Sequence, residues 1–300
     1  MTEATATRPD RMGWGIGLIL ISTLFTSLQD AAIKGFAGEV TLWQIYVLRS
    51  GLLIPALLAL ALGMGVPWRL AFTRWPMLRA GLFLAMYMAL YAAIPVLPLA
   101  VVAAGIYTAP LFVAGLSALV LGERVRPLGW LAIALGFAGV LVILKPGSEA
   151  FDGRVLVPVL AGFFYALSAL ATRGRLRGVP PVALALALAW GLLAAGLVGS
   201  VAVYLWPVPG GMGFLTGTWG AVTPRVCGLL AVLAALMLGN GLVLPAAYQA
   251  APVVVIATFD YAYLIWAALF GMWFFGEVPE GRTLLGMVMI AGAGGLVARA

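Results

Sequence analysis

Ten runs of about twenty predominantly apolar residues dominate this chain of 300 residues. A helix of that length crosses the ~30 Å hydrocarbon core of a bilayer. Helices also satisfy their own backbone hydrogen bonds inside lipid. We therefore predict an all-α integral membrane protein with ten transmembrane helices. The predicted spans lie at about 13–35, 41–63, 76–96, 98–121, 127–145, 154–173, 181–204, 225–247, 252–275 and 282–298.

The residue inventory excludes several classes of function. Hydrophobic residues make up 64% of the chain and charged residues 9%, whereas a soluble domain carries about 25% charge. The chain has no histidine and a single cysteine, Cys227, which rules out histidine-dependent catalysis, multi-cysteine metal sites and intrachain disulfides. Its Lys and Arg residues are scattered between apolar runs and form no nucleic-acid patch. We expect no enzymatic activity, cofactor, metal or nucleic-acid partner.

The positive charges predict the orientation in the membrane. Residues 1–12 are polar, and the first apolar run is longer than a signal-peptide core, so we expect it to be retained as a span. With the N-terminus inside, eleven Lys and Arg residues face the cytoplasm and five face outward, which favours cytoplasmic termini. The cytoplasmic set is Arg8, Arg11, Arg69, Arg74, Arg79, Arg124, Arg126, Arg173, Arg175, Arg177 and Arg299.

One stretch occurs twice. Residues 98–123 align without a gap on residues 252–277, at an offset of 154 residues, with seven identities. The identities include Tyr107 with Tyr261, and a Gly-Glu pair at the end of each copy. Five helices in each half would invert the second copy relative to the first, an arrangement common in transporters. We predict two inverted five-helix repeats, 1–147 and 148–300, around a central cavity.

Polar groups inside the spans are the first candidates for function, because they are costly in lipid unless they face a cavity or a partner. Gln29 and Asp30 lie near the end of the first run, where Asp30 either pairs with Lys34 one helical turn away or binds a cation or proton. Arg49 lies about two turns into the second run, beyond Gln44. Either Asp30 or a substrate carboxylate is a suitable partner for this arginine.

A second group of candidates lies deeper in the chain. Asp260 falls near the middle of the ninth run, and its counterpart in the first copy is Ile106, which favours a binding role over a scaffold role. Tyr107 and Tyr261 would approach the axis between the repeats from opposite sides. Aromatic walls with a few oriented polar groups suit small amphiphilic molecules. The remaining candidates are Tyr87, Tyr91, Tyr165, Trp190 and Asn240.

The run APLFVAGLSALVLGERVRPLGWLAIALGFAGVLVILKPG at residues 109–147 resembles the EamA type of the drug/metabolite transporter superfamily. The second copy, ending GEVPEGRTLLGMVMIAGAGGLVAR, resembles it as well. Overall similarity is highest to bacterial exporters of the aromatic amino acid type. The resemblance implies a basket of ten helices with a central cavity, and substrate efflux across the inner membrane by alternating access.

Three functions remain open at this point. The first is an amino-acid exporter in which Arg49 or a helix end binds the carboxylate, and acidic or tyrosine groups bind the amine. The second is a multidrug or other metabolite exporter with the same fold, in which Asp30 and Asp260 handle cations or protons. The third is a membrane-embedded enzyme or a structural subunit. We expect a monomer or weak homo-oligomer whose partners are lipid and a small-molecule substrate.

Overall fold

A computed structural model describes residues 11–35, 39–93, 105–122, 126–144, 156–207, 213–276 and 281–298. All regular structure in this part is helical. The helices are α1 (Met12–Gly35), α2 (Leu42–Gly63), η1 (Trp68–Phe72), α3 (Arg74–Ala93), α5 (Ala109–Leu116), η2 (Ser117–Leu121), α6 (Pro127–Leu144), α7 (Leu156–Arg175), α8 (Pro181–Leu205), α9 (Pro224–Ala250), α10 (Val253–Asp260), α11 (Ala262–Phe275) and α12 (Gly281–Ala298). The predicted boundary between the halves, at 147/148, lies outside the described residues.

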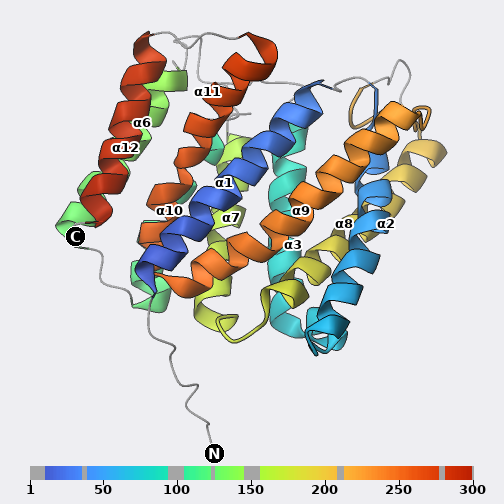
Figure 1. The fold of residues 1–300 in the computed structure, drawn as a ribbon, viewed down its shortest axis with the longest axis horizontal. Coiled ribbons are helices and arrows are strands. Elements are labelled where there is room, and N and C mark those ends of the chain that lie inside the picture. The colour runs from blue at the N-terminus through green and yellow to red at the C-terminus, as the bar shows by residue number, and fades with distance from the viewer. Residues whose placement is uncertain are drawn as a thin grey trace, which may run out of the picture.

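The helices form one bundle of tightly paired neighbours. The closest pairs are α6 with α12, α1 with α9, α2 with α8 and α3 with α7. Figure 1 shows α6 and α12 side by side at one edge of the bundle, and α2 and α8 at the opposite edge. Helices α1, α3, α7 and α9 occupy the middle, and α1 also packs against α10 and α11. Segments from both halves of the chain therefore build the centre.

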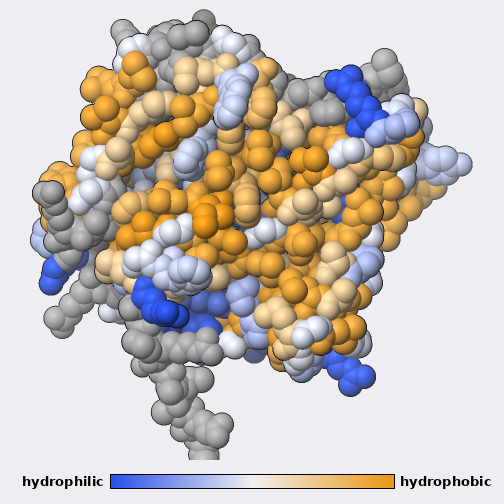
Figure 2. All heavy atoms as spheres, in the orientation of Figure 1, coloured by the Kyte–Doolittle hydropathy of each residue, from blue (hydrophilic) through white to orange (hydrophobic). Residues whose placement is uncertain are grey.

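The outside of this bundle is apolar. Large side chains such as Trp273 (81% exposed), Val198 (70%) and Leu62 (69%) project outward. Figure 2 shows a largely hydrophobic face, with most of the strongly hydrophilic residues toward its upper and lower edges. A soluble monomer does not expose contiguous apolar surface on this scale. The chain is thus a multi-pass membrane protein.

Six segments of the described chain are long and apolar enough to cross a membrane, and two shorter apolar helices accompany them. The six are Met12–Ile33, Leu42–Gly63, Leu156–Arg175, Pro181–Leu205, Pro224–Ala250 and Val253–Phe274. Helix α9 extends beyond its predicted end at residue 247. Tyr248 and Gln249 belong to α9 and not to the loop that follows it, because the helix continues to Ala250.

Local chemistry explains where several helices begin and end. Thr41 and Thr223 cap α2 and α9, and each hydroxyl accepts a hydrogen bond from a backbone amide three residues on. Gly122 and Gly276 end their helices with φ of 65° and 67°, in the left-handed conformation that favours glycine. These two glycines are the first residues of the duplicated Gly-Glu pairs. The duplicated glycine therefore has a backbone role.

The helical path tightens at two tyrosines that lie 154 residues apart. Turn residues Tyr107 and Thr108 separate Gly105–Ile106 from α5, and Tyr261 separates α10 from α11. At these points the amide of Thr108 bonds the Gly105 carbonyl, and the amide of Leu264 bonds the Tyr261 carbonyl. Both bonds span three residues, so the turn is tighter than an α-helical turn. The predicted span 252–275 is therefore two helices joined at Tyr261.

The connection between α8 and α9 is fastened to the start of α2. The amide of Leu42 donates to the Phe214 carbonyl (2.9 Å), and Trp43 Nε1 donates to the Leu215 carbonyl (2.7 Å). The Gln44 side chain, fully buried, bonds both backbone groups of Gly220 at 3.0 Å. Gln44, predicted as a substrate contact, thus has both ends of its amide engaged in holding this loop.

Replacing Gln44 with alanine is expected to destabilise the protein by about 1–3 kcal/mol, because two backbone groups of Gly220 lose their partners. Thermal unfolding in detergent measures the loss. Gln44→Glu keeps the acceptor and removes the donor, so it should fall between wild type and Gln44→Ala. Equal melting temperatures for all three proteins would contradict the role of Gln44 as a loop clamp.

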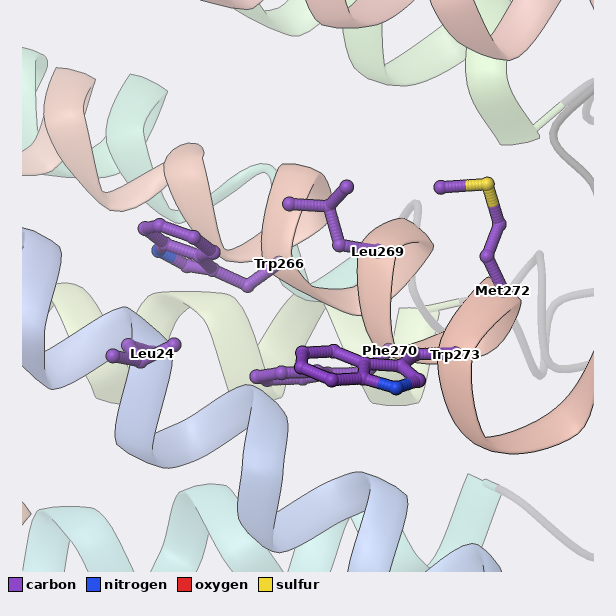
Figure 3. Close-up of a pocket in the computed structure, with 6 residues that line it drawn as sticks. All are labelled: Leu24, Trp266, Leu269, Phe270, Met272 and Trp273. Atoms are coloured by element: carbon purple, nitrogen blue, oxygen red, sulfur yellow. The ribbon is translucent and has the colours of Figure 1, made fainter.

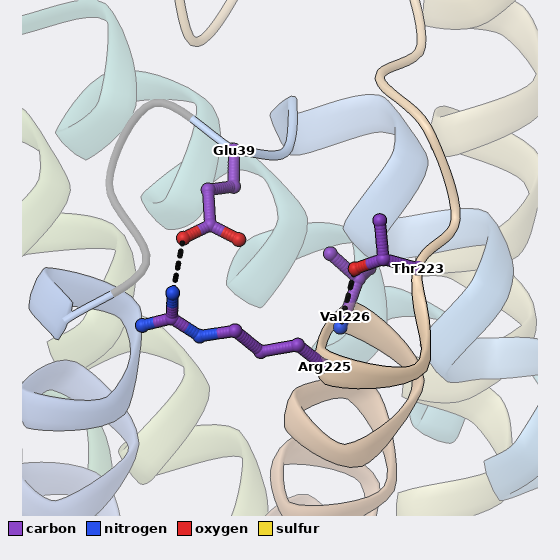
Figure 4. A network of polar contacts seen from close by, with 4 residues as sticks. All are labelled: Glu39, Thr223, Arg225 and Val226. Carbon is purple, nitrogen blue, oxygen red and sulfur yellow. Dashed lines mark hydrogen bonds and ion pairs between the residues drawn. The ribbon is translucent and has the colours of Figure 1, made fainter.

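An ion pair joins the segment before α2 to the first turn of α9. Arg225 contacts the Glu39 carboxylate at 3.4 Å, beside the capping bond from the Val226 amide to Thr223, as Figure 4 shows. The Arg225 and Glu39 side chains are 68% and 39% exposed. Exposed pairs contribute at most about 1 kcal/mol. Arg225 is therefore a suitable control site for substitutions of buried arginines.

Candidate functional site

Two carboxylates, the half-buried Asp260 and the more exposed Asp30, are each bonded to a tyrosine from another helix. Tyr165 on α7 donates to Asp260 at the end of α10 (2.6 Å), and accepts from Tyr248 on α9 (3.3 Å). Tyr263 on α11 donates to Asp30 on α1 (2.6 Å). The Tyr165 hydroxyl thus supplies a hydrogen bond to a partly buried carboxylate, a group that is costly to bury without a partner. The two sites join five helices.

Stacked tyrosine rings connect the two carboxylate sites. The Tyr107 ring lies 6.1 Å from that of Tyr261 at 30°, and 5.6 Å from that of Tyr263 at 34°. Tyr261 follows Asp260 in the chain and Tyr263 holds Asp30. We call this set the tyrosine–carboxylate cluster. It consists of Asp30, Tyr107, Tyr165, Tyr248, Asp260, Tyr261 and Tyr263.

Several buried polar atoms in the bundle have no hydrogen-bond partner in the described part of the chain. The Tyr261 hydroxyl is buried and has no hydrogen-bond partner in the described part of the chain. The same holds for Gln29 Oε1 on α1 and for the indole nitrogen of Trp190 on α8. Buried polar atoms are almost always bonded in folded proteins. The unpartnered atoms of Tyr261 and Gln29, which adjoin Asp260 and Asp30 in the chain, suit a site that binds water or a substrate.

Two buried arginines complete the polar interior. Arg49 on α2 is 5% exposed, its guanidinium lies 5.8 Å from the Tyr46 ring, and its Nε has no partner among the described residues. Arg79 on α3 is 3% exposed. Tyr87 lies within electrostatic reach of Arg49, Arg79 and Asp30. Cationic and anionic groups thus approach one region of the bundle.

The structure brings together only some of the candidates predicted from sequence. It joins Asp30, Tyr107, Tyr165, Asp260 and Tyr261 directly. In the described part Asp30 bonds Tyr263 and makes no ion pair with Arg49. The side chains of Tyr91 and Lys34 lie outside what the structure describes, so the Asp30–Lys34 alternative remains an expectation.

Asn240 has a structural role like that of Gln44. Its carbonyl accepts from Ser22 (2.6 Å) and its amide donates to Thr26 (3.1 Å), which ties α9 to α1. Trp190 packs its ring against Phe72 at 6.0 Å, near the end of the bundle where η1 lies. Gln44 and Asn240 thus bond loop and helix partners, and within the described part neither is hydrogen-bonded to a member of the tyrosine–carboxylate cluster.

Three residues that join the polar interior were not chosen from sequence. The sequence predicted Tyr248 in a loop and Arg79 among the cytoplasmic charges. It placed Tyr263 only near Asp260. A helical register could have indicated Tyr263, since it lies three residues after Asp260 and returns toward the same face. Neither Tyr248 nor Arg79 carries such a signal, because their partners come from other helices.

A separate hollow lies on the lipid-facing side of the bundle. It has a volume of about 520 Å³ and is lined by Leu24 of α1 and by Trp266, Leu269, Phe270, Met272 and Trp273 of α11. Figure 3 shows these apolar side chains around it. Trp273 is 81% exposed. The hollow belongs to the outer surface that contacts lipid, and the tyrosine–carboxylate cluster remains the candidate site.

Removing the Tyr165 hydroxyl tests the cluster. Tyr165→Phe is expected to destabilise the protein by about 1–3 kcal/mol, because Asp260 and Tyr248 both lose a partner. Asp260→Asn should cost less, since an amide oxygen still accepts from Tyr165. Thermal unfolding of the two variants and the double variant gives the coupling between them. Additive effects would show that the two side chains do not interact.

An all-helical membrane bundle with buried arginines and tyrosine-bonded carboxylates belongs to the class of multi-pass membrane proteins with an internal polar site. Comparison with known proteins narrows this class. Residues 13–145 match the model of the EamA-like transporter family, the family that the sequence resembles. The predicted likeness to aromatic amino acid exporters in particular has no specific support among the matched relatives.

The named relatives include transporters of different organic molecules. The chain is 32% identical over 189 residues to a riboflavin transporter of Rhizobium johnstonii, which covers 63% of this chain and 58% of that protein. It is 31% identical to a riboflavin transporter of Vibrio cholerae, over 61% of this chain and 57% of that protein. The chain thus spans less than two thirds of these riboflavin transporters.

Two other matches cover nearly the whole chain. The pseudopaline exporter CntI of Pseudomonas aeruginosa is 29% identical over 294 residues, which is 94% of each protein. A solved crystal structure superposes with a TM-score of 0.76 at 19% identity, over 95% of this chain and 96% of the other. At that identity the structural match shows the fold alone.

Proposed function

We propose that this protein exports small zwitterionic molecules, foremost aromatic and hydrophobic amino acids, across the bacterial inner membrane. One observation carries the proposal. Arg49 is buried, carries a permanent charge, and has an unpartnered Nε and no described carboxylate beside it. A guanidinium binds a carboxylate as a two-point fork, and a substrate that supplies this carboxylate completes the charge balance.

The rest of the site matches the other parts of an amino acid. In the described part of the chain, the carboxylates of Asp30 and Asp260 are hydrogen-bonded by tyrosine hydroxyls alone, so each keeps acceptor capacity for an ammonium group. The rings of Tyr107, Tyr261 and Tyr263 supply an aromatic wall. A mostly apolar site with a few oriented polar groups is typical of small-molecule recognition. The relatives that are named as transporters of organic molecules also support a transporter of small molecules.

The proposed mechanism is alternating access between two inverted repeats, 1–147 and 148–300, with both termini in the cytoplasm. Three features support it. Helices α6 and α12 have bounds that differ by 154 residues at both ends, and the capping glycines and the tyrosine turns share this offset. Discontinuous helices at the repeat interface are typical of transporter binding sites. We further propose that the protein acts as a monomer or weak homo-oligomer.

Counterflow in proteoliposomes tests the function directly. Vesicles that contain the purified protein are loaded with one unlabelled compound, and entry of the labelled compound is followed. The panel comprises phenylalanine, tryptophan, leucine, riboflavin and a lipophilic cation such as tetraphenylphosphonium. The proposal predicts counterflow of the amino acids above protein-free vesicles. Counterflow of only riboflavin or the cation would instead establish the alternative metabolite or multidrug exporter.

A further inference from the structure

Arg79 is buried where the sequence led us to expect a charge at the membrane boundary. It lies in the second turn of α3 and is 3% exposed. Its guanidinium carbon sits 4.6 Å from the centre of the Phe83 ring, one turn further along the same helix. A boundary arginine usually extends its head toward the headgroups. This one points into the bundle.

The protein supplies Arg79 with few partners. Its Nε donates to Thr172 Oγ1 on α7 at 2.7 Å, and the described part provides no further hydrogen bond or ion pair. The described part contains three acidic residues, and each is engaged elsewhere. Asp30 bonds Tyr263, Asp260 bonds Tyr165, and Glu39 pairs with Arg225. A buried guanidinium stays charged, so the charge of Arg79 has no counterion in this part of the protein.

Aromatic rings connect Arg79 to the candidate site. Phe83 packs edge-on against Tyr165 at 5.9 Å and lies 6.3 Å from Tyr87. Arg79 also lies within electrostatic reach of Tyr165, Tyr87 and Tyr248. Two of these tyrosines belong to the tyrosine–carboxylate cluster. The Arg79 head is therefore linked to the cluster through the rings of Phe83 and Tyr165, from the end of the bundle where α3 begins and α7 ends.

We propose that Arg79 forms an anion subsite, separate from Arg49, that binds the carboxylate of a small organic acid whose apolar part packs on Phe83 and Tyr87. Thr172 fixes the Nε edge of the guanidinium, so its other edge is left to make a two-point contact with a carboxylate. The subsite deepens the proposed function, because it gives the substrate carboxylate a binding point near one end of the path.

Binding of two matched probes to the full-length protein in lipid nanodiscs tests this subsite. The probes are 3-phenylpropionate and its uncharged amide, 3-phenylpropionamide, measured by titration calorimetry. Wild type should bind the carboxylate more tightly than the amide. Arg79→Gln should reduce this preference by about tenfold or more, as expected for a hydrogen bond to a charged group, while binding of the amide is unchanged.

Controls separate binding from folding. Arg225→Gln removes an exposed arginine and should leave the preference intact. If Arg79→Gln fails to fold, the carboxylate preference of Arg79→Lys is measured in its place. Lysine keeps the charge and loses the planar fork, so the preference should fall while the amide still binds as before. An unchanged preference in the Arg79 variants, or equal weakening of both probes, would overturn the subsite.

The probes carry no amine, so this result is independent of amino-acid transport. An Arg79-dependent preference without amino-acid counterflow would support the subsite and contradict the proposed substrate. Amino-acid counterflow combined with a carboxylate preference that does not depend on Arg79 would support the proposed function and contradict the subsite.

Discussion

Replacing Arg49 with glutamine is expected to lower amino-acid counterflow by about ten- to a hundredfold, the range of a hydrogen bond to a charged group. Arg49 is 5% exposed, and its Nε has no partner in the described chain, so a substrate carboxylate is its proposed counterion. The initial rate of labelled phenylalanine counterflow at subsaturating concentration measures the loss.

The matched control is Arg225→Gln, which removes an arginine whose side chain is 68% exposed at the surface. Its counterflow should equal that of wild type. Arg49→Lys should recover part of the rate, because lysine keeps the charge without the fork. If Arg49→Gln transports phenylalanine as fast as wild type, Arg49 does not bind the substrate.

The second large effect is expected where α6 crosses α12. A Cβ added to Gly139 would lie 2.8 Å from the Gly286 carbonyl oxygen and 3.0 Å from the Met289 Cβ, so the two helices would have to separate. Small residues permit this close approach in membrane helices. Gly139→Ala should therefore destabilise the protein by about 1–3 kcal/mol, the usual cost of overpacking.

The control lies on the same helix pair. A Cβ on Gly295 of α12 would meet no atom within 4 Å, so Gly295→Ala should unfold at or above the wild-type temperature. Thermal unfolding in detergent compares the two variants with wild type. Equal melting temperatures for Gly139→Ala and Gly295→Ala would show that the α6–α12 crossing does not depend on its glycine.

Helix positions were well predicted from sequence, because uninterrupted apolar runs in lipid have few alternatives to a helix. The predicted spans 13–35, 41–63 and 127–145 agree with α1, α2 and α6 to within one residue at each end. The turn at Tyr261 was not predicted. Its residues remain close to helical, with φ of −58° and ψ of −18°, and no proline or glycine marks the position.

The candidate site was predicted in part. The rarity of acids in lipid was enough to identify Asp30 and Asp260, and the duplicated tyrosine identified Tyr107 and Tyr261. Their partners could not be predicted, because almost every side of these helices is apolar and the sequence does not fix which side faces inward. Gln44 was predicted for the same reason as Asp30, because it is a polar residue in an apolar run. The sequence alone does not distinguish a buried amide that bonds Gly220 from one that binds a substrate.

The account depends most on a water-accessible chamber around the buried polar groups, and cysteine accessibility tests it directly. In a Cys227→Ser background, which removes the exposed native thiol, Tyr87→Cys and Tyr107→Cys are compared with Val198→Cys and Val288→Cys. The valines are 70% and 68% exposed on the apolar surface. A membrane-impermeant charged thiol reagent reacts only where water ionises the thiol. We predict that the two tyrosine positions react and the two valine positions do not; reaction at the valines with inert tyrosine positions would contradict the chamber.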